Sequence, residues 1–153
     1  MFTDRDKLIE HLLTFLSHIQ HLRLPLNYGQ VPENGKEIFE KLEILEIEAI
    51  KYPNDVTKMI KLLKMSPNVK TLKIHWIGNH AVSENLFAGV LKSAKNLEEL
   101  QFGAKTDTFE LKESQMDVIK ENCGEKLKKL TVFSSEVEEM QEKFNIFNDT
   151  KIQ

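Results

Sequence analysis

Histidine and cysteine are the side chains of this 153-residue chain best suited to binding a metal or attacking a substrate. His18 and His21 are three residues apart, and no carboxylate or third ligand follows them at close spacing. His75 and His80 lie on either side of a short loop segment. Because a protein metal site draws three or four such ligands together, this spacing favours surface or capping histidines. We expect no metal site and no cofactor.

Cys123 is the only cysteine, which excludes an intrachain disulfide. It follows Asn122, precedes Gly124 and falls in helical register with Met116 and Ile119. A nucleophilic cysteine needs a nearby base and an accessible, electropositive setting. The apolar register instead predicts a small buried residue at the end of a helix, with Gly124 as a left-handed cap.

Other patterns of catalysis and of nucleic-acid binding are missing from the sequence. The six glycines form no phosphate-binding loop, and no Gly-x-Ser-x-Gly turn occurs. Lys58, Lys61 and Lys64 make a basic helical edge, but without stacking aromatic residues beside it. The 21 Lys and Arg against 24 Asp and Glu give a net charge of -3, and no apolar run is long enough to span a bilayer. We expect a protein that is not an enzyme and binds neither nucleic acid nor a membrane.

The elements that would position these side chains follow from an internal repeat. An apolar residue, two others, an apolar residue, one other and an apolar residue recur five times. The copies are Ile19–Leu24, Leu42–Ile47, Val69–Ile74, Leu97–Phe102 and Leu127–Val132. Their central leucines lie 23, 27, 28 and 30 residues apart. This pattern and spacing resemble those of leucine-rich repeats, which place a short strand in each copy.

The segments between the copies read as helices. Pro53 suits the first turn of one helix and Pro67 ends it. A second helix is expected from about Ser83, and a third around Met116 to Cys123. After the Asn34-Gly35 turn signal, we expect a brief helix around Lys36–Leu42.

We therefore predict an α/β fold, a curved leucine-rich-repeat solenoid of about five strand–helix units. A parallel sheet would lie on its concave side and the helices on its convex side. The predicted domain is single and covers residues 1–153. Residues 1–18 would form an N-terminal capping helix, 19–133 the repeats, and 134–153 a C-terminal cap or tail.

The alternation of side chains along each strand predicts the concave surface. The central Leu and the apolar residue two positions on should point into the core, and their neighbours outward. The expected partner-binding residues are His21, Arg23, Ile44, Glu46, Glu48, Thr71, Lys73, His75, Glu99, Gln101, Lys129, Thr131 and Phe133. Their mixed charges suit a specific polypeptide better than a phosphate backbone. Ile44, Phe133 and Trp76 are candidate apolar anchors, although Trp76 could instead cap the core at the sheet edge.

Three helix-to-strand junctions carry a family resemblance. The first junction, Met65–Ile74, contains the sequence Pro-Asn-Val before the strand. The second, Ser93–Leu100, contains Lys-Asn-Leu, and the third, Ile119–Leu130, contains Asn-Cys-Gly. These junctions resemble those of F-box leucine-rich-repeat proteins, the substrate receptors of cullin-RING ubiquitin ligases, over roughly residues 17–135. The Leu-Pro that begins an F-box is normally upstream, whereas Leu24-Pro25 lies inside the first repeat. The resemblance therefore implies the recognition half only, with the F-box not present.

The expected function is a non-catalytic protein–protein interaction module, with substrate recognition in a ubiquitin-ligase context implied by the resemblance. The partner would be another protein, including ligase components if the repeats belong to an F-box chain. The alternative is a structural or assembly fragment of a longer solenoid that associates through its ends. The first residues mix both charges and do not form a secretory signal, so the expected location is cytoplasmic or nuclear.

Overall fold

A computed structural model describes residues 18–25, 39–50, 53–76, 84–103, 113–133 and 150–152 of the chain. The strands are β1 (His21–Pro25), β2 (Ile44–Ile50), β3 (Thr71–Trp76), β4 (Glu99–Gly103), β5 (Lys129–Phe133) and β6 (Thr150–Ile152). The helices are α2 (Pro53–Lys64), α3 (Glu84–Ser93) and α4 (Glu113–Cys123).

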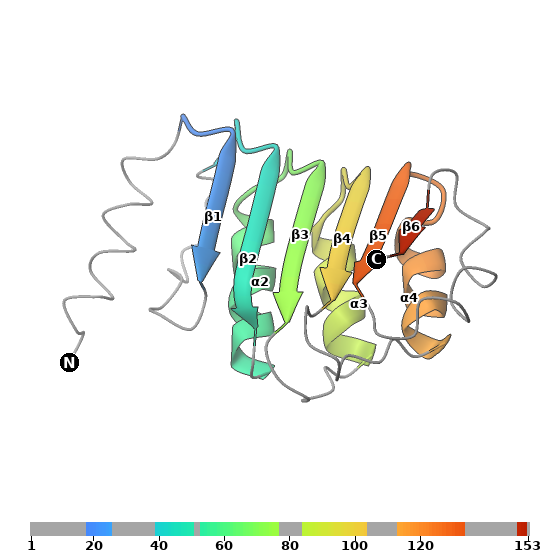
Figure 1. Cartoon of the computed structure of the whole chain (residues 1–153). Helices are drawn as coiled ribbons and strands as arrows, with labels where there is room; N and C mark the ends of the chain where they lie inside the picture. The colour runs from blue at the N-terminus through green and yellow to red at the C-terminus, as the bar shows by residue number, and fades with distance from the viewer. Residues whose placement is uncertain are drawn as a thin grey trace.

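The strands form one sheet in the order of the sequence, from β1 to β6, and every neighbouring pair is parallel. Helices α2, α3 and α4 form a second layer behind it (Figure 1). This arrangement confirms the predicted α/β class with a parallel sheet on one side and helices on the other. The sheet face opposite these helices, toward the viewer in Figure 1, is called the front face below.

The five repeat copies become β1 to β5, each strand beginning two residues after the first apolar residue of its copy. The two apolar positions of each strand point into the core, as predicted. Leu45, Leu72, Leu100 and Leu130 are at most 1% exposed, and Leu22 is 7% exposed. The residues two positions on are buried as well, except in β1, where Leu24 is half-buried. Alternation along the strands therefore fixes which side chains remain for the front face.

Helix α2 follows the sequence closely. It begins at Pro53, whose missing N–H costs nothing in the first turn, and it ends at Lys64, three residues before Pro67. Helix α3 packs onto the sheet through Phe87, which the sequence analysis did not single out. The ring of Phe87 lies 5.5 Å from that of Phe102 in β4, centroid to centroid, and both are buried.

Helix α4 ends as predicted with a buried Cys123, but the predicted left-handed cap at Gly124 is wrong. Among the described glycines only Gly103, at the end of β4, has a positive φ, of 135°. Gly124 is required for a different reason. A Cβ at this position would lie 2.6 Å from the carbonyl oxygen of Lys120, so no larger residue fits without a shift of the backbone.

The predicted helix around Lys36–Leu42 is also wrong for its described part, which is a turn from Phe39 to Leu42. Phe39 and Leu42 are fully buried, and the Phe39 N–H donates to the carbonyl of Met65 at 3.0 Å. The turn is thus held by burial, by this bond to the next unit and by one turn bond, from the Leu42 N–H to the carbonyl of Phe39 at 3.4 Å.

The two predicted caps have different outcomes. The N-terminal helix over 1–18 lies outside the described residues, apart from His18, which is in a turn. The C-terminal tail contributes β6, which pairs with β5 and makes a sixth strand where about five were expected.

The helix-to-strand turns line up along one edge of the sheet, the upper edge in Figure 1, called the turn edge below. Here one carbonyl in each unit accepts two consecutive N–H groups of the next unit. The accepting carbonyls belong to Gln20, Glu43, Lys70 and Glu98, each two residues before a central leucine, with N···O distances of 2.7 to 3.1 Å. The same bond pair therefore recurs four times along the stack.

A side-chain bond repeats at the same edge. Four residues before a central leucine, Asn68 and Asn96 donate to the carbonyls of Glu40 and Pro67 at 2.7 and 2.8 Å. In the following unit Lys126 takes this position, and its Nζ donates to the carbonyl of Lys95 at 3.2 Å. The repeat of the sequence is thus matched by a repeat of contacts.

Candidate functional site

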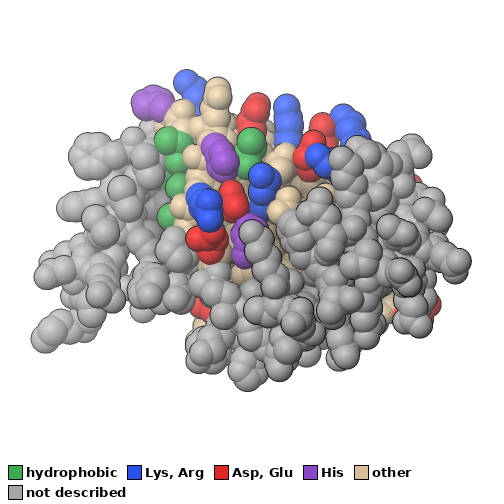
Figure 2. All heavy atoms as spheres, viewed as in Figure 1, with side chains coloured by type: hydrophobic (Ala, Val, Ile, Leu, Met, Phe, Trp, Pro, Cys, Tyr) green, Lys and Arg blue, Asp and Glu red, His purple; other side chains and the backbone are tan. Residues whose placement is uncertain are grey.

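The front face carries the residues that the sequence predicted for partner binding. Figure 2 shows histidine, basic and acidic side chains side by side across its middle. His21 and Arg23 are exposed, and the expected residues from Ile44 to Lys129 are half-buried. Thr131 differs, because it is only 8% exposed. The side chains of Phe133 and Trp76 lie outside the described residues.

Strand register arranges these side chains in rows. The first row, nearest the turn edge, is His21, Ile44, Thr71, Glu99 and Lys129. The second row is Arg23, Glu46, Lys73, Gln101 and Thr131. Neighbours in a row come from adjacent parallel strands, about 4.8 Å apart, so they can interact directly.

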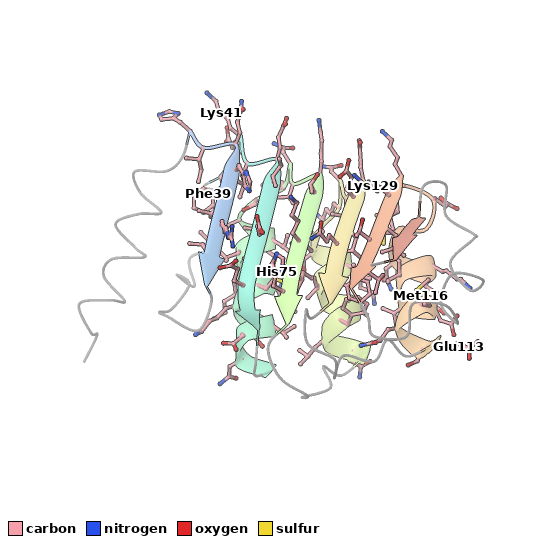
Figure 3. All side chains as sticks on the ribbon, in the orientation of Figure 1. Phe39, Lys41, His75, Glu113, Met116 and Lys129 are labelled. Atoms are coloured by element: carbon pink, nitrogen blue, oxygen red, sulfur yellow. The ribbon has the colours of Figure 1, made fainter. Side chains whose placement is uncertain are left out.

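Glu46 in β2 is the centre of the densest cluster, called the Glu46 cluster below and comprising Glu46, His21, Arg23 and His75. Its Oε1 lies 2.9 Å from Nε2 of His75 and 3.9 Å from Nε of Arg23. Its Oε2 lies 3.6 Å from Nε2 of His21. Figure 3 shows His75 toward the lower ends of β2 and β3. The three partners come from both neighbouring strands, so the cluster exists only because the strands align.

The charge of Glu46 is stabilised in this setting. Its side chain is 12% exposed, and burial by itself raises the pKa of the carboxyl. The hydrogen bond from His75 and the positive charges of Arg23 and Lys73 outweigh burial, so the pKa lies below its usual range. The carboxylate can only accept hydrogen bonds, and therefore His75 donates from Nε2.

The remaining carboxylates of the front face are also engaged. Glu48 accepts from Nε of Arg23 at 2.9 Å and pairs with the same guanidinium through Nη2. Glu99 lies 3.7 Å from Nζ of Lys129, which Figure 3 shows at the upper end of β5. Each of the three front-face glutamates that the structure describes therefore has a basic partner on a neighbouring strand.

Three polar side chains in the centre of the face are different. Lys73, Gln101 and Thr71 make no side-chain hydrogen bond or ion pair within the part of the chain that the structure describes. Lys73 and Gln101 are register neighbours, and Thr71 precedes Lys73 by two residues on the same strand. The sequence placed these residues on the face, but it did not show which polar groups would be left without partners.

A hollow lies along the turn edge, where sequence reasoning expected no site. It is lined by Gln20, Glu40, Lys41, Glu43, Asn68, Lys70, Asn96, Glu98, Glu125, Lys126, Leu127 and Lys128. Its charged side chains pair across units, as Lys128 does with Glu98 at 2.8 Å and Lys70 with Glu43 at 3.7 Å. The hydrogen bond from Lys128 lowers the pKa of Glu98. Because these contacts repeat from unit to unit, the hollow is a by-product of stacking.

The residues weighed for catalysis have structural positions. Cys123 is buried, its Sγ lies 3.3 Å from the carbonyl oxygen of Ile119, and burial raises the pKa of its thiol to about 11. A thiol in this state is a poor nucleophile at neutral pH. Within the described ranges, no group of three or more His, Cys, Asp or Glu side chains is arranged to hold a metal ion. His80 lies outside these ranges.

A search of the described helices finds none that is both long and apolar enough to cross a membrane. Comparisons of the chain with protein-family models, with curated proteins and with solved structures find no match. The functional argument therefore rests on the geometry of the front face.

Proposed function

We propose that the chain is a leucine-rich-repeat protein and that its front face binds another protein without catalysing a reaction. One observation carries the binding role. On a face of aligned strands, the carboxylates are engaged by neighbouring side chains, while Lys73, Gln101 and Thr71 keep their hydrogen-bonding groups free within the described part of the chain. Side chains held by a rigid sheet and left without partners are suited to bind a complementary surface.

Two regularities support the leucine-rich-repeat part of the proposal. The apolar pattern recurs five times with one strand in each copy. The bonds of the turn edge recur with the same period, including the side-chain bonds of Asn68 and Asn96. Stacked repeats of this kind form curved solenoids whose sheet lines a concave binding surface, which is the shape we propose for this chain.

The ubiquitin-ligase context is a narrower form of the same proposal. It rests on the resemblance of the three helix-to-strand junctions to those of F-box leucine-rich-repeat receptors. In that context the front face would hold the protein to be modified. The binding role does not depend on it, because one repeat architecture serves many unrelated partners.

Site-specific photo-crosslinking tests the binding role. A photo-crosslinking amino acid replaces Glu99 on the front face, and in a matched variant it replaces the exposed Glu121 on α4, behind the sheet. In cell lysate, we expect discrete crosslinked polypeptides from position 99 that an excess of unlabelled chain removes. Position 121 should not give these products.

Two results would contradict the proposal. Identical products from both positions would show that the front face has no special role. A product of twice the chain mass, with no other, would instead favour association between copies of the chain.

A further inference from the structure

Lys73 occupies the centre of the front face. It lies on β3, with Glu46 of β2 on one side and Gln101 of β4 on the other. Its ammonium group has three donors and no acceptor, and it makes no ion pair within the residues described. A group that binds at this position must therefore supply an acceptor, and a carboxylate is the strongest acceptor in a polypeptide.

The carboxylates around Lys73 do not fill this role. Glu46 accepts a hydrogen bond from His75 at 2.9 Å, and it affects Lys73 only through its charge. Glu99 pairs with Lys129. A basic partner would have to break these pairs to find an acceptor, whereas an acidic partner only has to reach Lys73. The existing pairs thus favour an acidic partner over a basic one.

Gln101 and Thr71 indicate how the partner's backbone lies. The amide of Gln101 can donate and accept at once, which matches the N–H and C=O of a peptide unit. The Thr71 hydroxyl, one row nearer the turn edge, offers a second donor and acceptor. Residues two apart on a strand are about 6.6 Å apart, the repeat of an extended chain. Thr71 and Lys73 are such a pair on β3, so an extended segment that runs along β3 can meet both, and Gln101, beside Lys73 on β4, lies within reach of its peptide unit.

The face is unsuited to a long polyanion. Glu46, Glu48 and Glu99 flank Lys73 on the same surface, on strands β2 and β4. A nucleic acid crossing several strands would bring its phosphates against these carboxylates. A single acidic side chain, by contrast, avoids them.

From this geometry we propose that the front face binds an extended, acidic segment of a partner protein. One carboxylate of the segment pairs with Nζ of Lys73, and one of its peptide units bonds to Gln101. This inference rests on the proposed function and adds the chemical class of the partner.

A peptide selection tests the inference with the full chain. A random 12-residue peptide library is selected on the immobilised chain, with Lys92→Gln as a control. Lys92 is exposed on α3, behind the sheet. Its replacement changes the net charge by the same amount as Lys73→Gln, but at a position away from the front face. We expect enriched peptides rich in Asp and Glu. Lys73→Gln should weaken them about tenfold, and Lys92→Gln should leave their affinity unchanged.

A second variant makes the outcome decisive. Lys73→Glu should reject the acidic peptides and select basic ones instead. Peptides that depend on Gln101 but carry no acidic residue would overturn the inference and leave the proposed function standing. Peptides that bind equally well after Lys73→Gln and Gln101→Ala would overturn both. Tighter binding of a single-stranded DNA oligonucleotide than of any peptide would also overturn the inference.

Discussion

The turn edge and the front face belong to the same strands, but their contacts are organised differently. At the turn edge each unit repeats the contacts of the unit before it, in backbone bonds and in the side-chain bonds of Asn68 and Asn96. On the front face, no side-chain contact between described residues recurs from unit to unit. The Glu46 cluster joins β1 to β3, while Lys73 and Gln101 on β3 and β4 have no such partners within the described chain.

This difference separates what holds the fold from what is free to bind. A contact that recurs in every unit stabilises the stacking of each unit on its neighbour. A contact that is made only once is not needed for this stacking. We therefore expect substitutions at the turn edge and in the core to lower stability, and substitutions of Lys73, Gln101 and Thr71 to change binding.

The largest loss of stability is expected from a core residue of β4, a strand that also contributes Gln101 to the front face. Leu100→Ala should lower the free energy of unfolding by about 2–5 kcal/mol, because Leu100 is 1% exposed. Its neighbour Gln101 points the other way, and Gln101→Ala should change stability by less than about 0.5 kcal/mol. Urea denaturation of both variants measures the contrast. Similar losses of unfolding free energy in the two variants would contradict the distinction between the core side and the front face of the strand.

The next largest loss of stability is expected at Gly124, which follows α4 at the turn edge. Gly124→Ala places a Cβ 2.6 Å from the backbone oxygen of Lys120 and should cost about 1–3 kcal/mol. Gly89→Ala is the matched control. Its Cβ would lie 3.1 Å from Cδ1 of Ile60, the movable end of a side chain, and alanine favours the helix. Thermal unfolding should show a lower midpoint for Gly124→Ala only; a larger drop for Gly89→Ala would contradict the reason given for Gly124.

The asparagines sharpen the comparison, because they occupy equivalent positions in two units. Asn68→Ala and Asn96→Ala should each cost about 0.5–1.5 kcal/mol, since each removes one hydrogen bond to a backbone carbonyl. The two losses should agree within experimental error in chemical denaturation. A loss in one variant alone would show that the turn edge does not act as a repeat.

The Glu46 cluster predicts a pH dependence of stability. Because the folded pKa of Glu46 is lowered, its contribution is present above the unfolded value of about 4.5 and is lost as the pH falls through the folded value. At pH 7, Glu46→Gln should be less stable than the natural chain by on the order of 1 kcal/mol. The difference should shrink in acid. Denaturation from pH 7 to pH 3 measures it, and a difference that grows in acid would contradict the assignment.

The exposed ion pairs of the turn edge should matter least. Lys128 lies 2.8 Å from Glu98 but is 71% exposed, so water and salt screen the pair. Lys128→Gln should lower the thermal midpoint less than any of the destabilising variants above, and added salt should abolish the difference. A salt-independent loss would show that the pair contributes more than its exposure allows.

Much of the fold could be predicted from the sequence, since it depends on local periodicity. The five apolar copies fixed β1 to β5, and Pro53 and Pro67 bounded α2. Two features could not be predicted because distant contacts decide them. Phe39 is buried in a turn tied to Met65, and the strand β6 has no copy of the repeat and exists through its pairing with β5.

The sequence predicts which residues lie on the front face, but not which of their side chains pair with each other. Alternation placed Glu46, Lys73 and Gln101 on one face. Their partners, however, depend on the register between neighbouring strands. The central leucines of these strands are 27 residues apart for β2 and β3 and 28 residues apart for β3 and β4. Register decides that His75 reaches Glu46. It also leaves Lys73 without a hydrogen bond or ion pair within the described residues. Thr131 shows the limit of alternation, because it lies on the predicted face and is nonetheless buried.

A binding titration of one selected acidic peptide tests the central claim most directly. The titration compares Lys73→Gln with Asn96→Ala by calorimetry, with the thermal midpoint of each chain measured alongside. Lys73→Gln should bind about tenfold more weakly with an unchanged midpoint, and Asn96→Ala should bind normally with a lower midpoint. Normal binding by Lys73→Gln, or an equal loss of binding in both variants, would contradict the separation of the front face from the turn edge.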